Sequence, residues 1–201
     1  KLKYCIGFTI RNGGIFVKIS TRDMILVSLF TALTAVGAFL SIPIGNVPIT
    51  LQSMFTILSG LILGPKLGSL SQLIYVLLGL AGVKIFAGFS GGPQTVFSPS
   101  FGFLIGFIFA SYIVGIIANT NEGINFKRII LATLAGTATI YLFGVPYMYL
   151  IINKVLLKKM SFLNAMKVGC VIFLPGDLLK CFASSYVAMK VVPKVNINTV
   201  K

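Results

Sequence analysis

The sequence predicts an all-α integral membrane protein with six transmembrane helices. Of its 201 residues, 57% are hydrophobic and only 10% are charged, and the mean hydropathy is +1.01. Several apolar runs are long enough to cross a lipid core of roughly 30 Å. We therefore expect residues 22–192 to form a single six-helix transmembrane domain, preceded by a cytoplasmic leader (1–21) and followed by a cytoplasmic tail (193–201).

Three helices are predicted in the first half of the chain. The apolar run at residues 25–42 is long enough to span a membrane, and Pro43 ends it. The next apolar stretch is too long for one crossing, and Gly64-Pro65 interrupts it. We therefore expect two short helices at 49–63 and 69–82, joined by a tight turn.

Residues 83–102 are predicted to form a structured cap rather than an ordinary loop. The segment is dense in glycine, proline, serine and phenylalanine, and it has no regular hydrophobic period. Irregular backbone near membrane depth needs protein or a cavity to satisfy its polar groups, so this segment is a candidate wall of a binding pocket. A packed connector with no binding role is the alternative interpretation.

Three further helices are predicted at 103–118, 129–152 and 165–192. Six crossings put both termini on one side of the membrane. Eleven bases fall on that side, namely Lys1, Lys3, Arg11, Lys18, Arg22, Lys66, Lys127, Arg128, Lys190, Lys194 and Lys201, and five fall opposite, namely Lys84, Lys154, Lys158, Lys159 and Lys167. Because cytoplasmic loops carry an excess of Lys and Arg, we expect both termini in the cytoplasm and a multi-pass protein of the cell membrane.

The net charge of +14 has a membrane explanation. The bases lie mostly outside the apolar runs, where they orient the chain and meet anionic lipid headgroups. No basic stripe with interleaved aromatic residues is present, so nucleic-acid binding is not expected. The chain has no histidine, and Cys5, Cys170 and Cys181 form no CxxC pair, so neither a metal site nor a cofactor is predicted.

Small residues recur four apart on the first predicted helix. They would form a smooth ridge that lets another helix approach closely. The members of this ridge are Ser28, Thr31, Ala32, Ala35 and Ala38.

An acid and a base lie together inside the last apolar run, in the stretch FLPGDLLK. Asp177 and Lys180 are three residues apart, so on a helix they share one face. Each charge near the middle of a span costs roughly 2.5–3.5 kcal/mol, which favours a pair that faces a cavity or a ligand. Pro175-Gly176 would loosen the helix just before the pair, at the extracellular side. A neutralising pair that only fixes helix packing is the alternative.

Catalysis finds little support in the residues. The sequence contains no GxxxxGK[ST] phosphate loop, no histidine and no intramembrane carboxylate pair. We expect a transport subunit rather than an enzyme, and any nucleotide hydrolysis belongs to another subunit. A membrane enzyme that uses Asp177 remains a minor alternative.

The sequence resembles the BioY family, the substrate-binding S subunits of energy-coupling-factor (ECF) biotin transporters. The resemblance extends over nearly the whole chain beyond the leader and is carried by stretches at 31–53, 61–92, 98–107, 141–149 and 173–180. It implies a bundle like that of ECF S components, which captures biotin from the outside. It also implies two kinds of partner, a transmembrane coupling subunit and a pair of ABC-type ATPases, and it assigns the ridge on the first helix to docking of the coupling subunit.

The resemblance also implies a set of ligand contacts. Asp177 and Lys180 match the positions expected to bind the ureido ring of biotin, and the glycine-rich cap falls on residues 86–92. The other implied contacts are Phe86, Tyr147 and Tyr149 as apolar walls, Gly91 and Gly92 in the cap, and Gln52, Gln94 and Ser98 as polar groups. The chain departs from the family pattern after Gly92, where it reads PQTVF and SPSFG. An S component or a carrier for another small vitamin is the remaining alternative. A thiamin or flavin site would use more aromatic stacking, and the chain has no tryptophan.

Overall fold

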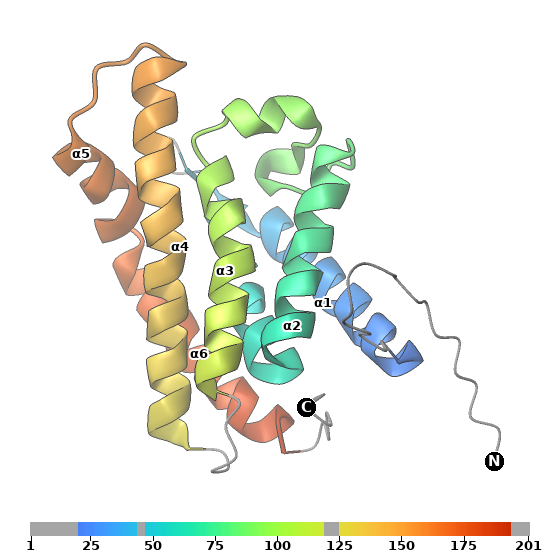
Figure 1. The fold of residues 1–201 in the computed structure, drawn as a ribbon. Coiled ribbons are helices and arrows are strands. Elements are labelled where there is room, and N and C mark those ends of the chain that lie inside the picture. Colours follow the sequence, from blue (N-terminus) through green and yellow to red (C-terminus); the bar gives the residue numbers. More distant parts are fainter. Residues whose placement is uncertain (1–19, 44–46, 119–124, 194–201) are drawn as a thin grey trace, which may run out of the picture.

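The computed structural model describes residues 20–43, 47–118 and 125–193, and these form a helical bundle (Figure 1). Most of the predicted leader and tail therefore lies outside the described residues. Five helical stretches in the described part are long and apolar enough to cross a membrane. They are α1 (Thr21–Phe39), α2 (Gln52–Leu80), α3 (Phe101–Ala118), α4 (Phe126–Lys154) and the run Phe162–Val191, which contains α5 (Phe162–Met166), η3 (Lys167–Val171) and α6 (Leu174–Val191).

Two short strands and two short 3-10 helices complete the described fold. Strands β1 (Ser41–Ile42) and β2 (Ile49–Thr50) pair antiparallel between α1 and α2. The 3-10 helices η1 (Ala87–Phe89) and η2 (Pro93–Phe97) form the cap, which covers the upper ends of α2 and α3 (Figure 1). The predicted structured cap is therefore present.

Helix α1 begins where a capping box can form. The backbone N–H of Asp23 donates to Ser20 Oγ, and the N–H of Ser20 donates to Asp23 Oδ2, both at 3.1 Å. This reciprocal pair satisfies two backbone donors at the helix start. One of the three carboxylates of the chain is thereby assigned to capping.

Helix α2 is a hairpin with a break at Gly64. Gly64 has φ +79° and ψ −178°, outside the helical region, and Pro65 follows it. Thr56 Oγ1 donates to Gln72 Oε1 at 3.1 Å, although sixteen residues of straight helix would separate them by about 24 Å. The two arms, 52–63 and 65–80, therefore fold back on each other, and the break predicted at Gly64-Pro65 is confirmed.

A network of neutral side chains joins this hairpin to its neighbours. The Nε2 of Gln72 lies within 3.3 Å of the hydroxyl oxygens of Thr34, Ser59 and Ser71, and Ser59 Oγ lies 2.8 Å from Ser111 Oγ. These side chains are fully buried. We call the group the Gln72 network; its members are Thr34, Thr56, Ser59, Ser71, Gln72 and Ser111. It ties α1 and α3 to both arms of α2.

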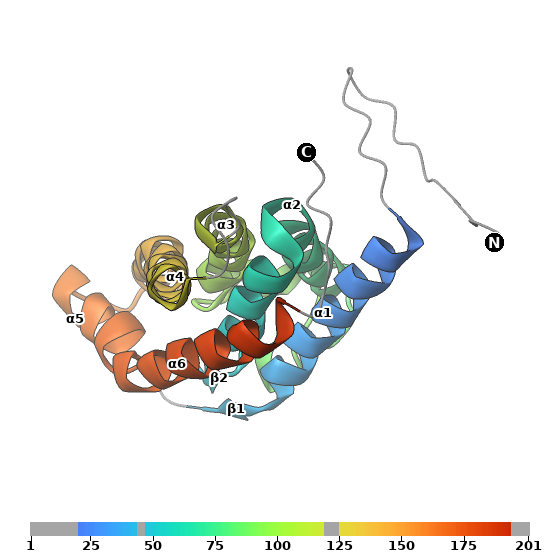
Figure 2. The same cartoon turned by 90° about the horizontal axis from the view of Figure 1, so that it is seen from below.

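The helices are arranged around two apolar clusters. Viewed from below, α2, α3 and α4 lie in a row, and α1, α6 and the strands lie on the opposite side (Figure 2). One cluster joins the cap to α3 and α4 through residues such as Phe86, Phe101 and Met148. The other joins α1, both arms of α2 and α6 through residues such as Phe30 and Leu61. The first cluster borders the candidate site.

The last membrane helix is broken, whereas the sequence predicted one helix over 165–192. Residues Lys167–Val171 form a π-helix, and α6 begins only at Leu174. The cause is Pro175, which has no N–H and whose ring would clash with the carbonyl of residue 171 in a continuous α-helix. The backbone takes the wider hydrogen-bonding pattern just before it. Asp177 therefore lies in the first turn of α6.

The predicted ridge on α1 does not form one outward face, which corrects that expectation. Thr31 and Ala38 are buried, and Thr31 Oγ1 donates to the carbonyl oxygen of Ser71 at 2.9 Å. Ser28 and Ala32 are exposed. At about 100° per residue, the five positions spread over roughly a third of the helix circumference. The edge with Thr31 and Ala38 therefore packs α1 against the second arm of α2, and the edge with Ser28 and Ala32 faces outward.

Candidate ligand-binding site

A cavity lies beneath the cap, between the start of α2, α3, α4 and α6. The segment before α2 contributes Val47 and Thr50, and the first turn of α6 contributes Asp177. Its remaining walls come from the cap and from the facing sides of α3 and α4. The cap has irregular backbone, and the helix is interrupted just before α6. Both of these segments border the cavity.

The polar end of the cavity is built around Asp177, which is 8% exposed. Its Oδ1 lies 2.8 Å from Lys180 Nζ, and its Oδ2 accepts a hydrogen bond from the hydroxyl of Tyr141. Lys180 Nζ also donates to Ser53 Oγ at 3.3 Å. We call Ser53, Tyr141, Asp177 and Lys180 the Asp177 cluster. All four line the cavity.

The Asp177 cluster keeps unused hydrogen-bonding capacity. A carboxylate can accept about four hydrogen bonds, and the two named here leave lone pairs on both oxygens. An ammonium group has three donors, and Lys180 uses two of them on Asp177 and Ser53. The cluster can therefore accept hydrogen bonds from donors on a ligand and donate to a ligand oxygen at the same place.

The middle of the cavity is walled by phenylalanine side chains from three elements. Phe86 comes from the cap, Phe101 and Phe103 from α3, and Phe173 precedes α6. Phe86 is 3% exposed because its ring packs on Gly79, where a Cβ atom would lie 2.0 Å from the ring. Such walls suit a flat apolar ligand body.

The cap is fastened at both ends by tyrosine hydroxyls. Tyr75 donates to the carbonyl oxygen of Ile85 at 2.9 Å, and Tyr147 donates to that of Val96. The ring of Tyr75 also meets Phe86 edge-on, with 5.5 Å between centroids. The cap backbone is thus held in place over the cavity.

These features can be compared with those of known proteins. A model of the BioY family matches residues 11–197. The chain belongs to the BioY family.

Three curated relatives have similar lengths. The chain is 39% identical over 169 residues to a probable biotin transporter BioY of Lysinibacillus sphaericus, covering 84% of this chain and 86% of the relative. It is 37% identical to the biotin transporter BioY of Thermotoga maritima, with 84% and 95% covered. It is 41% identical to a probable biotin transporter BioY of Pyrococcus horikoshii, with 83% and 94% covered.

A solved structure has the same architecture. It is a 2.1 Å crystal structure of the S-component for biotin from an ECF-type ABC transporter, with a TM-score of 0.72 and 26% sequence identity. The match covers 85% of this chain and 90% of that chain. The bundle is therefore an S-component fold, and the chain is a multi-pass membrane protein.

Half of the contacts implied by the BioY resemblance line the cavity. Those that do are Gln52, Phe86, Ser98, Asp177 and Lys180. Those that do not are Gly91, Gly92, Gln94, Tyr147 and Tyr149. Four residues of the second group belong to the cap or hold it, and Tyr149 lies elsewhere.

Gly91, Gly92 and Gln94 act on the cap itself. A Cβ atom at Gly91 would lie 2.4 Å from the carbonyl oxygen of Val83, and Gly92 has φ +96° and donates its N–H to Gly79. Gln94 Nε2 donates to the carbonyl of Gly91 at 2.6 Å, and Gln94 is exposed. Close backbone approach explains Gly91, and the positive φ explains Gly92.

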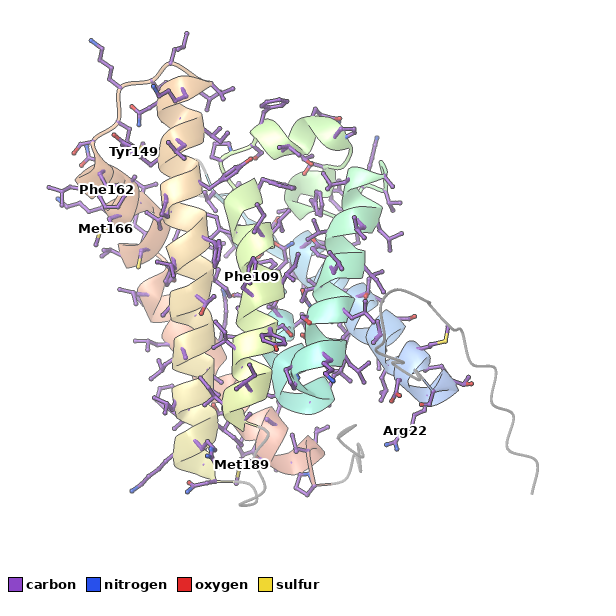
Figure 3. All side chains as sticks on the ribbon, viewed as in Figure 1. Arg22, Phe109, Tyr149, Phe162, Met166 and Met189 are labelled. Carbon is purple, nitrogen blue, oxygen red and sulfur yellow. The ribbon has the colours of Figure 1, made fainter. Side chains whose placement is uncertain are left out.

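The two tyrosines of α4 contact other parts of the protein. Tyr147 holds Val96 of the cap and packs beside Phe101. Tyr149 meets Phe162 of α5 edge-on, with 5.6 Å between ring centroids, and Figure 3 shows this pair between α4 and α5. Tyr147 and Tyr149 were expected to wall the ligand, but neither lines the cavity.

Tyr141 and Ser53 are the members of the Asp177 cluster that the sequence analysis missed. Tyr141 opens the stretch 141–149 on which the resemblance partly rests, but it lies 36 residues before Asp177 and nothing local pairs them. Ser53 lies beside Gln52 and is 127 residues from Lys180. The available signal was that both fall within matched stretches.

Proposed function

We propose that this chain is the biotin-binding S component of an ECF-type transporter and that biotin binds in the cavity beneath the cap. The observation that carries the proposal is the buried Asp177–Lys180 pair at the end of a phenylalanine-walled cavity. Buried ion pairs add little net stability, so a ligand accounts for the pair better than packing does. Membership of the BioY family and the likeness to an S-component for biotin support the same conclusion.

The head group of biotin matches the Asp177 cluster in hydrogen-bonding type. A ureido group presents two N–H donors and one carbonyl acceptor. The free lone pairs of Asp177 would accept from the N–H groups, and Lys180 would donate its third hydrogen to the carbonyl oxygen. Ser53 Oγ accepts a hydrogen bond from Lys180, so the hydroxyl hydrogen of Ser53 points away from Lys180. This hydrogen can supply a second hydrogen bond to the ureido carbonyl oxygen. The site needs no metal and no cofactor for this task.

The apolar body of the ligand would lie between Phe86 and the phenylalanines of α3. Gln52 supports this wall indirectly, because its Nε2 donates to the hydroxyl of Tyr75 and its Oε1 accepts from Thr50. Both groups of the Gln52 amide are therefore engaged within the protein. Ser98 is the candidate polar contact in the cap.

We propose six crossings with both termini in the cytoplasm. The α2 hairpin supports the count, because its two arms convert one candidate span into two passes. The bases divide accordingly. Arg22 lies at the start of α1, Lys66 beside the break in α2, Lys127 and Arg128 at the start of α4, and Lys190 at the end of α6. At the opposite helix ends, Lys84 follows α2, and Lys154, Lys158, Lys159 and Lys167 lie between the last residue of α4 and the first of η3. The described bases are thus balanced, and the cytoplasmic excess comes from the terminal residues, outside the described part.

The exposed side of α1 is the proposed docking surface for the coupling subunit. Two ABC-type ATPases would complete the transporter. Ser28 and Ala32 are exposed on it, and Ala35 is half-buried. Small exposed side chains let a partner helix approach closely.

Ala32→Trp should abolish co-purification of the coupling subunit and leave biotin binding intact. Leu142→Trp, at a 70% exposed position on α4, is the matched control and should change neither.

The experiment that tests the proposed function is calorimetry of the purified full chain in detergent against a panel of vitamins. Biotin should bind and release heat, and thiamin and riboflavin should not. Binding of another vitamin with biotin excluded would refute the assignment and favour an S component of different specificity. Turnover of any ligand into a product would favour the membrane enzyme instead.

A further inference from the structure

The cavity is charged at one end only. Among the described residues that line it, Asp177 and Lys180 are the charged ones, and they neutralise each other at 2.8 Å. The cap end is lined instead by uncharged hydroxyl side chains. These are Ser90, Thr95, Ser98 and Ser100.

The hydroxyls of the cap are partly used by the cap backbone. Thr95 Oγ1 donates to the carbonyl of Gly92 at 2.6 Å, and Ser90 Oγ donates to that of Ala87 at 2.9 Å. Their lone pairs remain free. Ser98 and Ser100 share one hydrogen across 2.9 Å between their oxygens, which leaves the second hydrogen of the pair free to donate. The cap end can thus both donate and accept without carrying charge.

The cap end is the more exposed end of the cavity. Ser90 lines the cavity and is exposed, whereas Asp177 at the other end is buried. The one base of the cap segment 83–102, Lys84, is exposed and does not line the cavity. A ligand whose head group contacts Asp177 would therefore place the end of its tail near the cap hydroxyls and water.

We propose that the tail of biotin is recognised without a cation, so that the chain binds biotin amides and esters about as tightly as biotin itself. This inference rests on the proposed function. Charge-assisted hydrogen bonds are roughly twice as strong as neutral ones, so a cation at the tail would select the carboxylate. Hydroxyls can donate to a carboxylate, an amide or an ester carbonyl. Their bond to an ionised carboxylate is stronger, but the larger cost of taking that charge out of water offsets the gain. Specificity then resides at the ureido end, where buried polar groups would be left unpaired by a wrong ligand.

Titration calorimetry of the full chain with biotin, biotinamide and biotin methyl ester tests the proposal. The three dissociation constants should agree within about fivefold, a difference below about 1 kcal/mol. A preference for the free acid greater than about fivefold overturns the proposal. The two proposals fail differently: if neither acid nor amide binds, the proposed function fails, and if the acid binds and the amide does not, only this inference fails.

Variants at the two ends sharpen the test. Ser98→Lys should create a preference of at least about tenfold for the acid over the amide, because it supplies the missing cation; Thr95→Lys is the substitute if that protein does not fold. Asp177→Asn should weaken acid and amide by the same factor. Lys84→Gln should leave the acid-to-amide ratio unchanged, and a ratio that falls in this variant would mean that Lys84 holds the carboxylate and the proposal is wrong.

Discussion

Two groups of polar side chains are buried in this bundle, and they differ in what remains of their hydrogen-bonding capacity. In the Gln72 network, the amide and hydroxyl groups are fully buried and bonded to one another. In the Asp177 cluster, a carboxylate and an ammonium group face a cavity with lone pairs and a hydrogen to spare. The first group is complete without a ligand, whereas the second is complete only with one.

The cost of burial explains why this difference indicates function. Neutral groups satisfied within a membrane bundle contribute modestly to stability, about 0.6 kcal/mol per hydrogen bond on average. Charged groups inside a span cost roughly 2.5–3.5 kcal/mol each. The attraction within an ion pair adds little net stability after the desolvation cost. A chain could fix its helices with Gln72 and its partners alone. The ion pair is therefore better explained by recognition than by architecture.

The largest effect on biotin affinity is expected from Asp177→Asn. The amide keeps the shape but loses acceptor capacity, presents donors to the ligand N–H groups and leaves Lys180 without a counter-charge. We expect the dissociation constant to rise at least about tenfold, or roughly 1.4 kcal/mol. Calorimetric titration is the measurement, after circular dichroism and size-exclusion controls. Unchanged affinity in well-folded protein would reduce the Asp177 cluster to a packing device like the Gln72 network.

Lys180→Met is the complementary variant. It removes the donor proposed for the ligand oxygen and leaves Asp177 as an unpaired buried acid. Biotin binding should weaken here too, measured in the same titration. Retained affinity would mean that the ligand oxygen has another donor, of which Ser53 is the nearest candidate.

A smaller effect is expected from Tyr141→Phe. The variant keeps the ring and removes the donor to Asp177 Oδ2, so the carboxylate is less firmly oriented. We expect biotin to bind about fivefold more weakly, in line with the loss of one hydrogen bond to a charged group. Tyr149→Phe is the matched control, because Tyr149 lies away from the cavity, and its affinity should equal that of the unaltered chain. Equal affinities in both variants would remove Tyr141 from the site.

Ser53→Ala should have a modest effect. It removes the acceptor for one hydrogen of Lys180 and the proposed second donor to the ligand carbonyl. A loss of about threefold in affinity is expected for biotin. The loss should shrink for the thiocarbonyl analogue, since sulfur accepts hydrogen bonds weakly. An equal loss for both ligands would argue that Ser53 only positions Lys180.

Gln72→Leu should leave biotin affinity almost unchanged and affect stability instead. Removing the amide leaves the hydroxyls of Thr34, Thr56 and Ser59 without that partner in a dry interior. We expect a loss of about 1–3 kcal/mol in unfolding free energy, measured by denaturant titration in detergent micelles. If affinity fell as far as in Asp177→Asn, the two polar groups would be coupled and the contrast between them would be wrong.

The fold could be predicted where the sequence carries a local signal. Gly64-Pro65 indicated the hairpin because few other pairs interrupt a helix so strongly. A loosening of the helix at Pro175-Gly176 was expected, but the start of a new helix at Leu174 was not. Proline is tolerated in the first turn of a helix, and its position alone does not tell a helix start from a helix interior. The orientation of Thr31 and Ala38 was also missed, since an apolar helix in lipid lacks a polar face that would mark its outer side.

The candidate site could be predicted only where its members are close in sequence. Asp177 and Lys180 are three apart and share a helix face, so their pairing was foreseeable. Tyr141 and Ser53 join them through packing of α2, α4 and α6, which no local pattern encodes. Tyr147 was predicted as a ligand contact because it is aromatic and lies in a matched stretch. In the structure its hydroxyl donates to the carbonyl oxygen of Val96 in the cap.

The α2 hairpin bears on how the chain enters the bilayer during synthesis. Its arms, 52–63 and 65–80, are about 18 and 24 Å long, shorter than a hydrocarbon core of about 30 Å, and they carry the amides of Gln52 and Gln72. Neither arm alone is a good substrate for the translocon, so the two would leave it together, already paired. The positive φ of Gly64 sets that pairing. A bulky residue there would lower the amount of protein inserted, while the molecules that did insert would bind ligand normally.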